Sequence, residues 1–397
     1  MKKIAITTSV SISNYGTKLQ ALAMCRIFEE RGFQPLVLEY SEALPQKWIV
    51  QLKNYLGKIV KPILFGKNYL YVAKFNREYH NTDQFFLNNI ISRYKAIDAD
   101  DCMIPHSKII GSRIKLQNYA RQFDAAVTGS DQVWHPVLNK SNLWFFTLNF
   151  VNNSIRKIAY APSLGVDVLT PEQAILFKKL LINLDYISLR EKSGVDSIQS
   201  LTDKNVSLVL DPTLLVGRKL WDKLYSECKV PKNVNYCLCY LLGTNSEHRR
   251  ICEMVASKLG LKIFNFSHFK AYNEADDKLS GEKLFDVSPM EFVGLVKNAK
   301  FVITDSFHCS VFSMMYHIPF MTLLRFQNND SLSTNTRIFS MLSQFGLDNR
   351  ILSSDKDIDI IVNSSIDFDR VEECLAAKRK ISNSFLDQAL GDEKIEI

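Results

Sequence analysis

KFVITDSFHCSVFSMMYHIPF, residues 300–320, is the stretch that decides the fold. Residues 301–303 form a β-rich run of Phe, Val and Ile, which predicts a buried strand. Residues 304–306 supply turn and N-cap chemistry, so the apolar segment behind them is expected to be a helix that ends before Pro319. Another strand is expected at residues 320–324. Strand, corner, helix and strand in this order predict a parallel α/β sheet.

The corner carries two candidate site residues, Ser306 and His308, in the first turn of the expected helix. Backbone N–H groups are unpaired at a helix N-terminus, and the helix dipole adds positive potential there. A histidine at such an end is well placed to hold an anion. The alternative is a half-buried histidine whose polar atoms are satisfied. We interpret the corner as functional, because ligands bind at the carboxyl ends of parallel strands.

The same alternation extends to both sides of this stretch. Further strands are expected at residues 2–8, 34–39, 123–127, 156–161, 185–189, 206–210, 233–241 and 262–265, and helices at residues 17–31, 171–184, 247–259, 289–298, 337–345 and 367–390. The pattern predicts an α/β protein with two Rossmann-like parallel-sheet domains facing a central cleft. We expect the first domain at residues 1–215, the second at residues 216–365 and a helical tail at residues 366–397.

Residues 45–120 interrupt the alternation and are interpreted as a helical insertion in the first domain. Between residues 45 and 75 the insertion has six lysines, interleaved aromatic residues and no carboxylate. We favour a solvated insertion whose lysine stems cover its own apolar face. The alternative is peripheral contact with anionic lipid at the inner face of the membrane.

Composition excludes several classes of protein. The chain has 397 residues, 46% of them hydrophobic, and a net charge of +7, which is too mild an excess to indicate a nucleic-acid partner. None of the eight cysteines forms a CxxC pair, and Cys237 and Cys239 are expected to be buried in a strand. The N-terminal apolar run is too short for a signal peptide, and no window approaches a membrane span. These features predict a cytoplasmic protein.

Two loops after strands carry further candidates for substrate binding. Asn14, Tyr15 and Gly16 precede the first helix, where an amide and free N–H groups suit a carboxylate, phosphate or sugar hydroxyl. The alternative is a turn with an N-cap. The second loop, at residues 129–135, contains the candidates listed here: Ser130, Asp131, Gln132 and Trp134. Carboxylate and amide groups suit sugar hydroxyls, and an indole can stack on a sugar ring. The alternative for this loop is a capped turn with the indole in the core.

Two arginines complete the candidate site. Arg190 stands at a strand end, where its guanidinium can clamp a carboxylate or phosphate; the alternative is a surface pair with Glu191. Arg337 opens a later helix and can add positive charge to a phosphate site; the alternative is a surface arginine. Asp211, Pro212 and Thr213 are expected to end the first domain, and Pro212 and Thr213 are interpreted as structural. The chain has no GxGxxG, Walker, HExxH or GxSxG motif and no metal-ligand spacing.

Seven motifs in order carry a resemblance to a known family. They are NYGTKLQALAM, AVTGSDQVWHP, KIAYAPSLG, ISLREKSG, LVLDPTLL, FVITDSFHCSVFSMMYHIPF and NTRIFSMLSQFGLDNRIL. Over residues 1–40 and 120–352 the chain resembles the polysaccharide pyruvyl transferases. The resemblance implies a GT-B-like architecture. It also implies transfer of a pyruvyl group from phosphoenolpyruvate to a sugar, such as galactose, of a surface polysaccharide or its lipid-linked precursor. The product is a cyclic ketal, and phosphate is released.

The resemblance also places three family residues: its SFH histidine falls on His308, its RE arginine on Arg190 and its GSDQ carboxylate on Asp131. The chemistry of ketal formation suggests their roles. We expect His308 to be a general acid or phosphate ligand, Arg190 to hold a carboxylate or phosphate, and Asp131 to be a base or a sugar ligand. Cys309 stands where the family commonly has Gly, and Pro162 where a small residue is common. No metal or cofactor is expected, and phosphoenolpyruvate is the donor substrate. The competing interpretations are a GT-B glycosyltransferase that uses a nucleotide sugar and a non-catalytic sugar-binding protein of envelope assembly.

Overall fold

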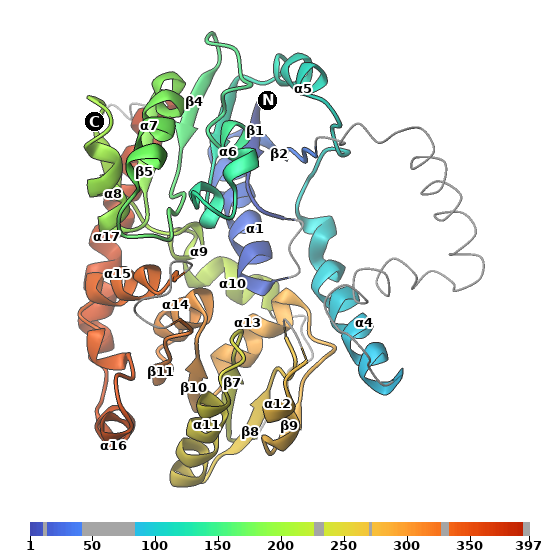
Figure 1. Ribbon diagram of the computed structural model, residues 1–397, viewed down its shortest axis with the longest axis vertical. Helices are drawn as coiled ribbons and strands as arrows, with labels where there is room; N and C mark the ends of the chain where they lie inside the picture. Colours follow the sequence, from blue (N-terminus) through green and yellow to red (C-terminus); the bar gives the residue numbers. More distant parts are fainter. Residues whose placement is uncertain (11–13, 42–83, 226–233, 270–271, 327–332, 392–397) are drawn as a thin grey trace.

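The computed structural model describes residues 1–10, 14–41, 84–225, 234–269, 272–326 and 333–391. In it, two parallel sheets lie one above the other along the long axis of the molecule (Figure 1). The basic and aromatic stretch at residues 45–75 lies outside the described residues. The part of the expected insertion that is described, residues 84–120, contains helices, as the sequence predicts.

The first sheet has six strands among the described residues, in the order β2-β1-β3-β4-β5-β6, and every neighbouring pair is parallel. The strands are β1 (Lys2–Thr7), β2 (Phe33–Val37), β3 (Ala125–Thr128), β4 (Arg156–Ala159), β5 (Tyr186–Leu189) and β6 (Val206–Leu208). Each was predicted, with ends that differ by no more than two residues. The near-continuous apolar character of these strands is typical of a sheet covered on both faces.

The second sheet has five described strands in the order β11-β10-β7-β8-β9, again all parallel. They are β7 (Tyr236–Tyr240), β8 (Lys262–Asn265), β9 (Glu282–Lys283), β10 (Phe301–Thr304) and β11 (Phe320–Thr322). The edge strand β9 was not predicted, because two charged residues carry no hydrophobic pattern. Cys237 and Cys239 are buried in β7, as expected.

Helices connect and cover the strands. They are α1 (Tyr15–Glu30), α4 (Gln84–Ala99), α5 (Arg113–Ala120), α6 (Leu143–Phe146), α7 (Pro171–Leu180), α8 (Lys192–Gln199), α9 (Pro212–Leu215), α10 (Gly217–Tyr225), α11 (Ser246–Leu259), α12 (Glu274–Lys278), α13 (Pro289–Asn298), α14 (Phe307–Met315), α15 (Thr336–Gln344), α16 (Ile358–Asn363) and α17 (Phe368–Leu390). Thr170 and Ser288 form capping boxes with Pro at the next position, which explains the sharp starts of α7 and α13.

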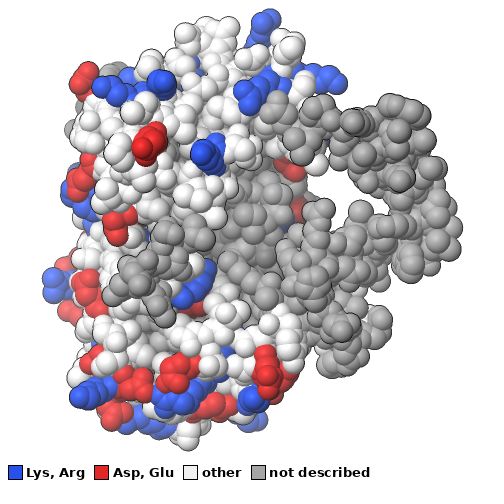
Figure 2. Space-filling model, viewed as in Figure 1, with Lys and Arg blue, Asp and Glu red and all other residues white. Residues whose placement is uncertain are grey.

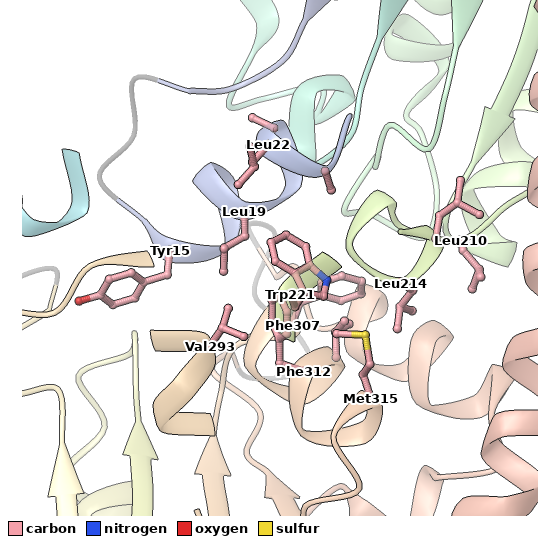
Figure 3. Close-up of a cluster of buried hydrophobic side chains, with 14 of the residues drawn as sticks. Tyr15, Leu19, Leu22, Leu210, Leu214, Trp221, Val293, Phe307, Phe312 and Met315 are labelled. Atoms are coloured by element: carbon pink, nitrogen blue, oxygen red, sulfur yellow. The ribbon is translucent and has the colours of Figure 1, made fainter. Parts of the chain in front are cut away.

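The opening stretch forms β10, α14 and β11, and every residue of α14 is buried. This helix is apolar on most of its faces because other elements surround it. Helix α1 packs against α9 in the first half and against α13 and α14 in the second. Figure 3 shows the apolar side chains that meet there, including Leu19, Phe307 and Phe312. This shared core holds the carboxyl ends of the two sheets toward each other.

Two helices cross between the halves. Arg93 of α4 donates hydrogen bonds to the carbonyl oxygens of Ser267 (2.6 Å) and Leu284 (2.9 Å), which belong to the second half. The long helix α17 returns to the first half (Figure 1), where Ser382 Oγ accepts from the N–H of Leu210 at 2.9 Å. The predicted domain boundaries remain a proposal, since the chain passes between the halves more than once.

Acidic and basic side chains are interspersed over the described part of the face in Figure 2. This distribution agrees with the mild net charge of +7. Among the described residues, none of the helices has the length and apolar character needed to cross a lipid bilayer.

Candidate functional site

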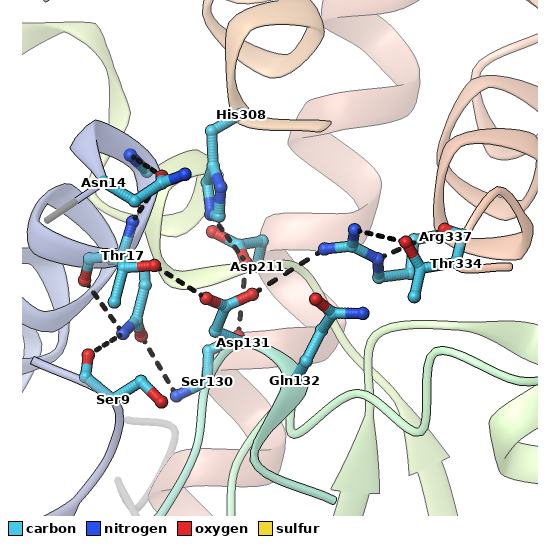
Figure 4. Close-up of polar contacts among 12 residues, drawn as sticks. Ser9, Asn14, Thr17, Ser130, Asp131, Gln132, Asp211, His308, Thr334 and Arg337 are labelled. Atoms are coloured by element: carbon cyan, nitrogen blue, oxygen red, sulfur yellow. Dashed lines mark hydrogen bonds and ion pairs between the residues drawn. The ribbon is translucent and has the colours of Figure 1, made fainter. Parts of the chain in front are cut away.

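Four ionisable side chains meet where the carboxyl ends of the two sheets face each other, and Figure 4 shows three of them, Asp131, Asp211 and His308. Asp131 follows β3, Arg190 follows β5 and Asp211 follows β6, whereas His308 comes from the first turn of α14 in the other half. Three of them, Asp131, Arg190 and His308, were predicted as catalytic. Parallel strands deliver their carboxyl ends to one edge, and this brings residues from distant parts of the chain together.

Both terminal nitrogen atoms of Arg190 are paired with protein carboxylates, whereas its Nε has no hydrogen-bond partner among the described residues. Its Nη1 donates to Asp211 Oδ2 at 2.5 Å and its Nη2 donates to Asp131 Oδ1 at 3.1 Å, while the guanidinium lies 4.3 Å from the centre of the Phe307 ring. Burial acts to lower the pKa of Arg190, but Asp211, Asp131 and Glu191 more than offset this and raise it above its ordinary range. The alternative of a surface pair with Glu191 is wrong, because both side chains are buried.

Asp211 was expected only to lie at the end of the first domain, and the structure places it at the centre of the cluster. Its Oδ1 accepts from the hydroxyl of Thr213 at 2.6 Å, and its Oδ2 lies 3.2 Å from Ser130 Oγ and 3.7 Å from His308 Nε2. Burial acts to raise the pKa of Asp211, but His308 and Arg190 hold it well below its ordinary range. This carboxylate therefore stays ionised and links the two halves of the molecule.

Asp131 has an unusual backbone. Its φ of 66° and ψ of −170° lie in a region that is used almost only by glycine, and such strain clusters at functional sites. Thr17 donates its hydroxyl to Asp131 Oδ2 at 3.0 Å, and Arg337 Nη1 lies 3.8 Å from Oδ1. Burial acts to raise the pKa of Asp131, but Arg190, His308 and Arg337 hold it below its ordinary value. Asp131 is thus a better hydrogen-bond acceptor than a base.

His308 is held by the close approach of α1. The imidazole is buried, and its Nε2 has no hydrogen-bond partner among the described residues. A Cβ atom on Gly16 would lie 2.1 Å from His308 Nδ1, so only glycine leaves room for the ring. Ser306 is the N-cap of α14, with its Oγ 3.5 Å from the N–H of Cys309. Gly16 and Ser306 were predicted as substrate ligands; in the structure Gly16 packs against the His308 ring, and Ser306 caps the helix that carries His308.

Asn14 and Ser130 also have structural contacts. Asn14 is the N-cap of α1 and its Oδ1 accepts from the N–H of Gly16 at 2.9 Å, which is the alternative that the sequence left open. Ser130 is fully buried; its N–H donates to Gln20 Oε1 at 3.1 Å and its Oγ lies 2.8 Å from the carbonyl oxygen of Ala161. These contacts fix the loops that present Gly16 and Asp131.

Tyr15 and Trp134 lie in the hydrophobic core, contrary to the expectation that they contact substrate. The Tyr15 ring stacks on Phe292 with centroids 4.8 Å apart and its hydroxyl donates to the Val287 carbonyl at 3.0 Å. Trp134 is fully buried and its Nε1 donates to the Phe146 carbonyl at 2.7 Å. Both side chains are large rings whose polar atom has a hydrogen-bond partner, and such side chains are stabilised by burial in the core.

Arg337 is less well paired than Arg190. Its Nε and Nη2 donate to the carbonyl and hydroxyl oxygens of Thr334 at 3.3 and 3.1 Å, and the nearest carboxylate oxygen belongs to Asp131. Burial and the nearby charge of Arg190 lower the pKa of Arg337 to about 10. The side chain of Gln132 extends toward the same place (Figure 4). Arg337 is therefore a buried cation with an incomplete set of anionic partners.

Sequence reasoning missed Asp211 and the buried carboxyl group of Glu191. Burial raises the pKa of Glu191, and Arg190, whose Nε lies 3.6 Å away, offsets only part of this effect. A signal for Asp211 existed, because it follows a strand as Asp131 does. Within the described part of the chain, no three His, Cys, Asp or Glu side chains are grouped so that they could hold a metal ion. The site offers cations and hydrogen-bond donors for an anion, and ionisable groups for proton transfer.

The fold and the site define a two-domain α/β protein whose polar centre lies between the ends of two parallel sheets. The sequence model of the polysaccharide pyruvyl transferases matches residues 14–325, which is most of the chain. The protein belongs to this family. Asp131, Arg190, Asp211 and His308 all fall inside the matched range. No curated protein matches the chain.

Solved structures support the GT-B-like fold that the sequence predicted. The chain is similar to UDP-N-acetylglucosamine 2-epimerase from Rickettsia bellii, with 11% identity and a TM-score of 0.50 over 100% of this chain and 99% of that one. It also matches UDP-GlcNAc 2-epimerase from Methanocaldococcus jannaschii, with 13% identity and a TM-score of 0.48 over 95% and 99% of the two chains. Phytolacca americana UGT2 matches with 14% identity and a TM-score of 0.42 over 97% and 94%. At these identities the likeness concerns the fold alone.

Proposed function

We propose that this protein transfers a pyruvyl group from phosphoenolpyruvate to two hydroxyls of a sugar in a surface polysaccharide or its lipid-linked precursor. Two C–O bonds form at the central carbon of the donor, and the bond from that carbon to the phosphate oxygen breaks. One hydroxyl proton ends on the methylene carbon, which becomes a methyl group, and the other leaves with phosphate or a base. Family membership and the anion-binding character of the site support the proposal.

The observation that carries the proposal is the position of His308 beside Asp211. The imidazole Nε2 has no hydrogen-bond partner among the described residues and lies 3.7 Å from the ionised carboxylate. Asp211 can therefore stabilise positive charge on the ring when it carries a proton. His308 is our candidate for the group that protonates the methylene carbon, a role for which a positioned histidine is well suited.

The other charged groups receive complementary roles. Arg337 would bind an acidic group of the donor, because its positive charge is incompletely compensated. Asp131 would accept a hydrogen bond from a sugar hydroxyl, since its lowered pKa makes it a weak base. Arg190 holds Asp131 and Asp211 in place. A cytoplasmic location at the inner membrane face, where lipid-linked acceptors would be reached, is part of the proposal.

The activity is tested by incubating the protein with phosphoenolpyruvate and a panel of β-galactosides, followed by measurement of phosphate and ketal product. Formation of both in a one-to-one ratio would support pyruvyl transfer. Turnover that requires a nucleotide sugar would instead select a glycosyltransferase. Sugar binding without turnover with either donor would select a non-catalytic binding protein.

The role of His308 is tested by His308→Asn, with His317→Asn as the control. His317 lies at the molecular surface of the second half, where it contacts Glu372, and its φ of 60° suits asparagine. We expect His308→Asn to lower kcat about 10²- to 10⁴-fold, the usual contribution of a general acid, with a nearly unchanged Tm. Equal activity of the two variants, or a large loss of stability in His308→Asn, would return His308 to a structural role.

A further inference from the structure

His135, at the end of the loop that carries Asp131, has a fixed protonation pattern. The residue is fully buried, and its Nδ1 accepts hydrogen bonds from the N–H groups of Val137 (3.3 Å) and Leu138 (3.2 Å). A neutral imidazole has one accepting and one donating nitrogen, so Nε2 must carry the proton. No hydrogen-bond partner for Nε2 exists among the described residues. A buried N–H donor without a protein partner is rare in folded proteins, and an ordered water or a ligand supplies the missing acceptor.

Gln132 provides another donor at the same place. Its Nε2 is buried and also lacks a partner in the described part of the chain. A Cβ atom on Gly165 would lie 2.8 Å from Gln132 Nε2 and 3.1 Å from Cδ2 of His135, the ring atom bonded to Nε2. The two side chains therefore lie beside each other against the Cα of Gly165, where the close approach and a φ of +68° both favour glycine.

Arg337 supplies positive charge next to these donors. Thr334, whose methyl group lies 3.6 Å from the same Gly165 position, accepts two hydrogen bonds from the Arg337 guanidinium. Burial and the charge of Arg337 lower the pKa of His135 to about 4, so the imidazole is neutral at pH 7 and remains a donor. A sugar hydroxyl would satisfy the N–H groups but leave the charge of Arg337 uncompensated. An oxyanion would satisfy both.

We propose that His135 Nε2–H, the Gln132 amide and the Arg337 guanidinium form a subsite that binds one oxyanionic group of the substrate, a phosphate or a carboxylate. The inference rests on the proposed function in that phosphoenolpyruvate carries both groups. It adds His135 as a binding residue. It also gives Arg190 the role of a positioning residue, because both of its terminal nitrogen atoms are already paired, Nη1 with Asp211 and Nη2 with Asp131.

The two sources of an oxyanion are separated by calorimetry on the full chain. Inorganic phosphate serves as the probe for the phosphate group and pyruvate as the probe for the carboxylate. We expect one of the two probes to bind wild-type protein measurably, and that probe identifies the group that occupies the subsite. If neither probe binds at millimolar concentration, the proposal is wrong.

Two substitutions at His135 distinguish the role of its Nδ1 atom from that of its Nε2 atom. The Asn oxygen of His135→Asn can replace Nδ1 as the acceptor for the loop N–H groups, but the variant lacks the Nε2 donor. The amide of His135→Gln reaches toward the Nε2 position and keeps a donor. Because a hydrogen bond to a charged group is strong, we expect His135→Asn to raise Kd for the bound probe and KM for phosphoenolpyruvate about 10- to 100-fold. His135→Gln should recover part of this loss, and kcat should change less than KM.

Gln132→Glu tests the subsite without removing the hydrogen bonds that His135 Nδ1 accepts from Val137 and Leu138. It keeps the shape of the side chain but replaces the amide donor by a negative oxygen, and it should weaken probe binding at least as much as His135→Asn. Unchanged Kd and KM in His135→Asn and Gln132→Glu would overturn the subsite. The two proposals fail separately. If probe binding depends on His135 but no pyruvyl transfer is found, only the proposed function is wrong. If pyruvyl transfer is found but KM is unchanged in both variants, only the subsite is wrong.

Discussion

Two neighbouring regions of the site each contain a buried arginine, and the two arginines differ in how closely carboxylates approach them. In the paired region, Arg190 contacts Asp211 at 2.5 Å and Asp131 at 3.1 Å, and its side chain is only 1% exposed. In the open region, Arg337 has one carboxylate oxygen at 3.8 Å and lies beside two donors without partners in the described residues, on Gln132 and His135. Charge in the paired region is neutralised within the protein, so it maintains geometry. Charge in the open region is left for a ligand.

The largest expected effect is on stability, and it compares the two arginines directly. Arg190→Met leaves two buried carboxylates without their main partner and should lower the free energy of unfolding by about 3–5 kcal/mol. Arg337→Met loses two hydrogen bonds but also removes an under-compensated charge, so the cost should be about 1 kcal/mol. Urea unfolding of both variants measures the difference. Similar losses would show that the two regions do not differ in the way described.

Gly16→Ala tests how tightly the paired region is built around His308. The added Cβ would overlap the imidazole, whose Nδ1 would be 2.1 Å away, so the ring must move from Asp211. We expect a loss of stability of about 1–3 kcal/mol, as for other overpacking substitutions, and a fall in kcat close to that of His308→Asn. Gly32→Ala is a space control, because nothing lies within 4 Å of its Cβ position, although its φ of 79° adds backbone strain. Full activity of Gly16→Ala would contradict the role of this contact.

His135, in the open region, should make the free energy of unfolding depend on pH. The pKa of His135 falls from its ordinary value of 6.5 to about 4 on folding, so the unfolded chain binds the proton more tightly. The contribution of His135 is complete above pH 6.5 and is lost as the pH falls toward 4. Burial also lowers the pKa of His248, so wild-type protein has further slope in this window. His135→Asn should show a shallower slope than wild type in urea unfolding between pH 7 and 4.5, and parallel curves would contradict the prediction.

The smallest effect is expected at Trp134, which lies in the core behind the open region. Trp134→Phe removes the hydrogen bond to the Phe146 carbonyl, an oxygen that keeps the hydroxyl of Thr128 as a donor at 2.6 Å. The loss of stability should be about 1 kcal/mol, and KM for the sugar acceptor should be unchanged. A raised KM for the acceptor with unchanged stability would instead support stacking of the indole on a sugar.

Much of the fold was predictable because periodicity and caps are local. The ten predicted strands and the corner at Ser306 could be located from apolar runs, N-cap residues and prolines in the printed sequence. The edge strand β9 was not predicted, because it is held by backbone pairing with β8 and its charged side chains show no strand pattern. The family resemblance over residues 1–40 and 120–352 agrees with the match of the family to residues 14–325.

Most residues of the candidate site could be located from the sequence, but their roles were harder to predict. Polar residues that follow strands could be selected one loop at a time, and this found Asp131, Arg190 and His308. Asp211 was missed because an Asp-Pro-Thr corner is explained equally well by its N-cap, whose contact with Thr213 the structure also shows. Tyr15 was assigned to the substrate site because the sequence around the start of α1 gives no sign of the aromatic residues that the other half packs against this ring.

The sequence by itself determined the two parallel sheets, their helices and the family, since these depend on patterns within short segments. Only the tertiary structure decided which arginine is neutralised and which remains open to an anion. Pairing depends on distances between residues 59 and 21 positions apart, Arg190 with Asp131 and with Asp211, and on the approach of α1 to α14 at Gly16. Electrostatic interactions act through space, and a linear pattern does not contain those distances.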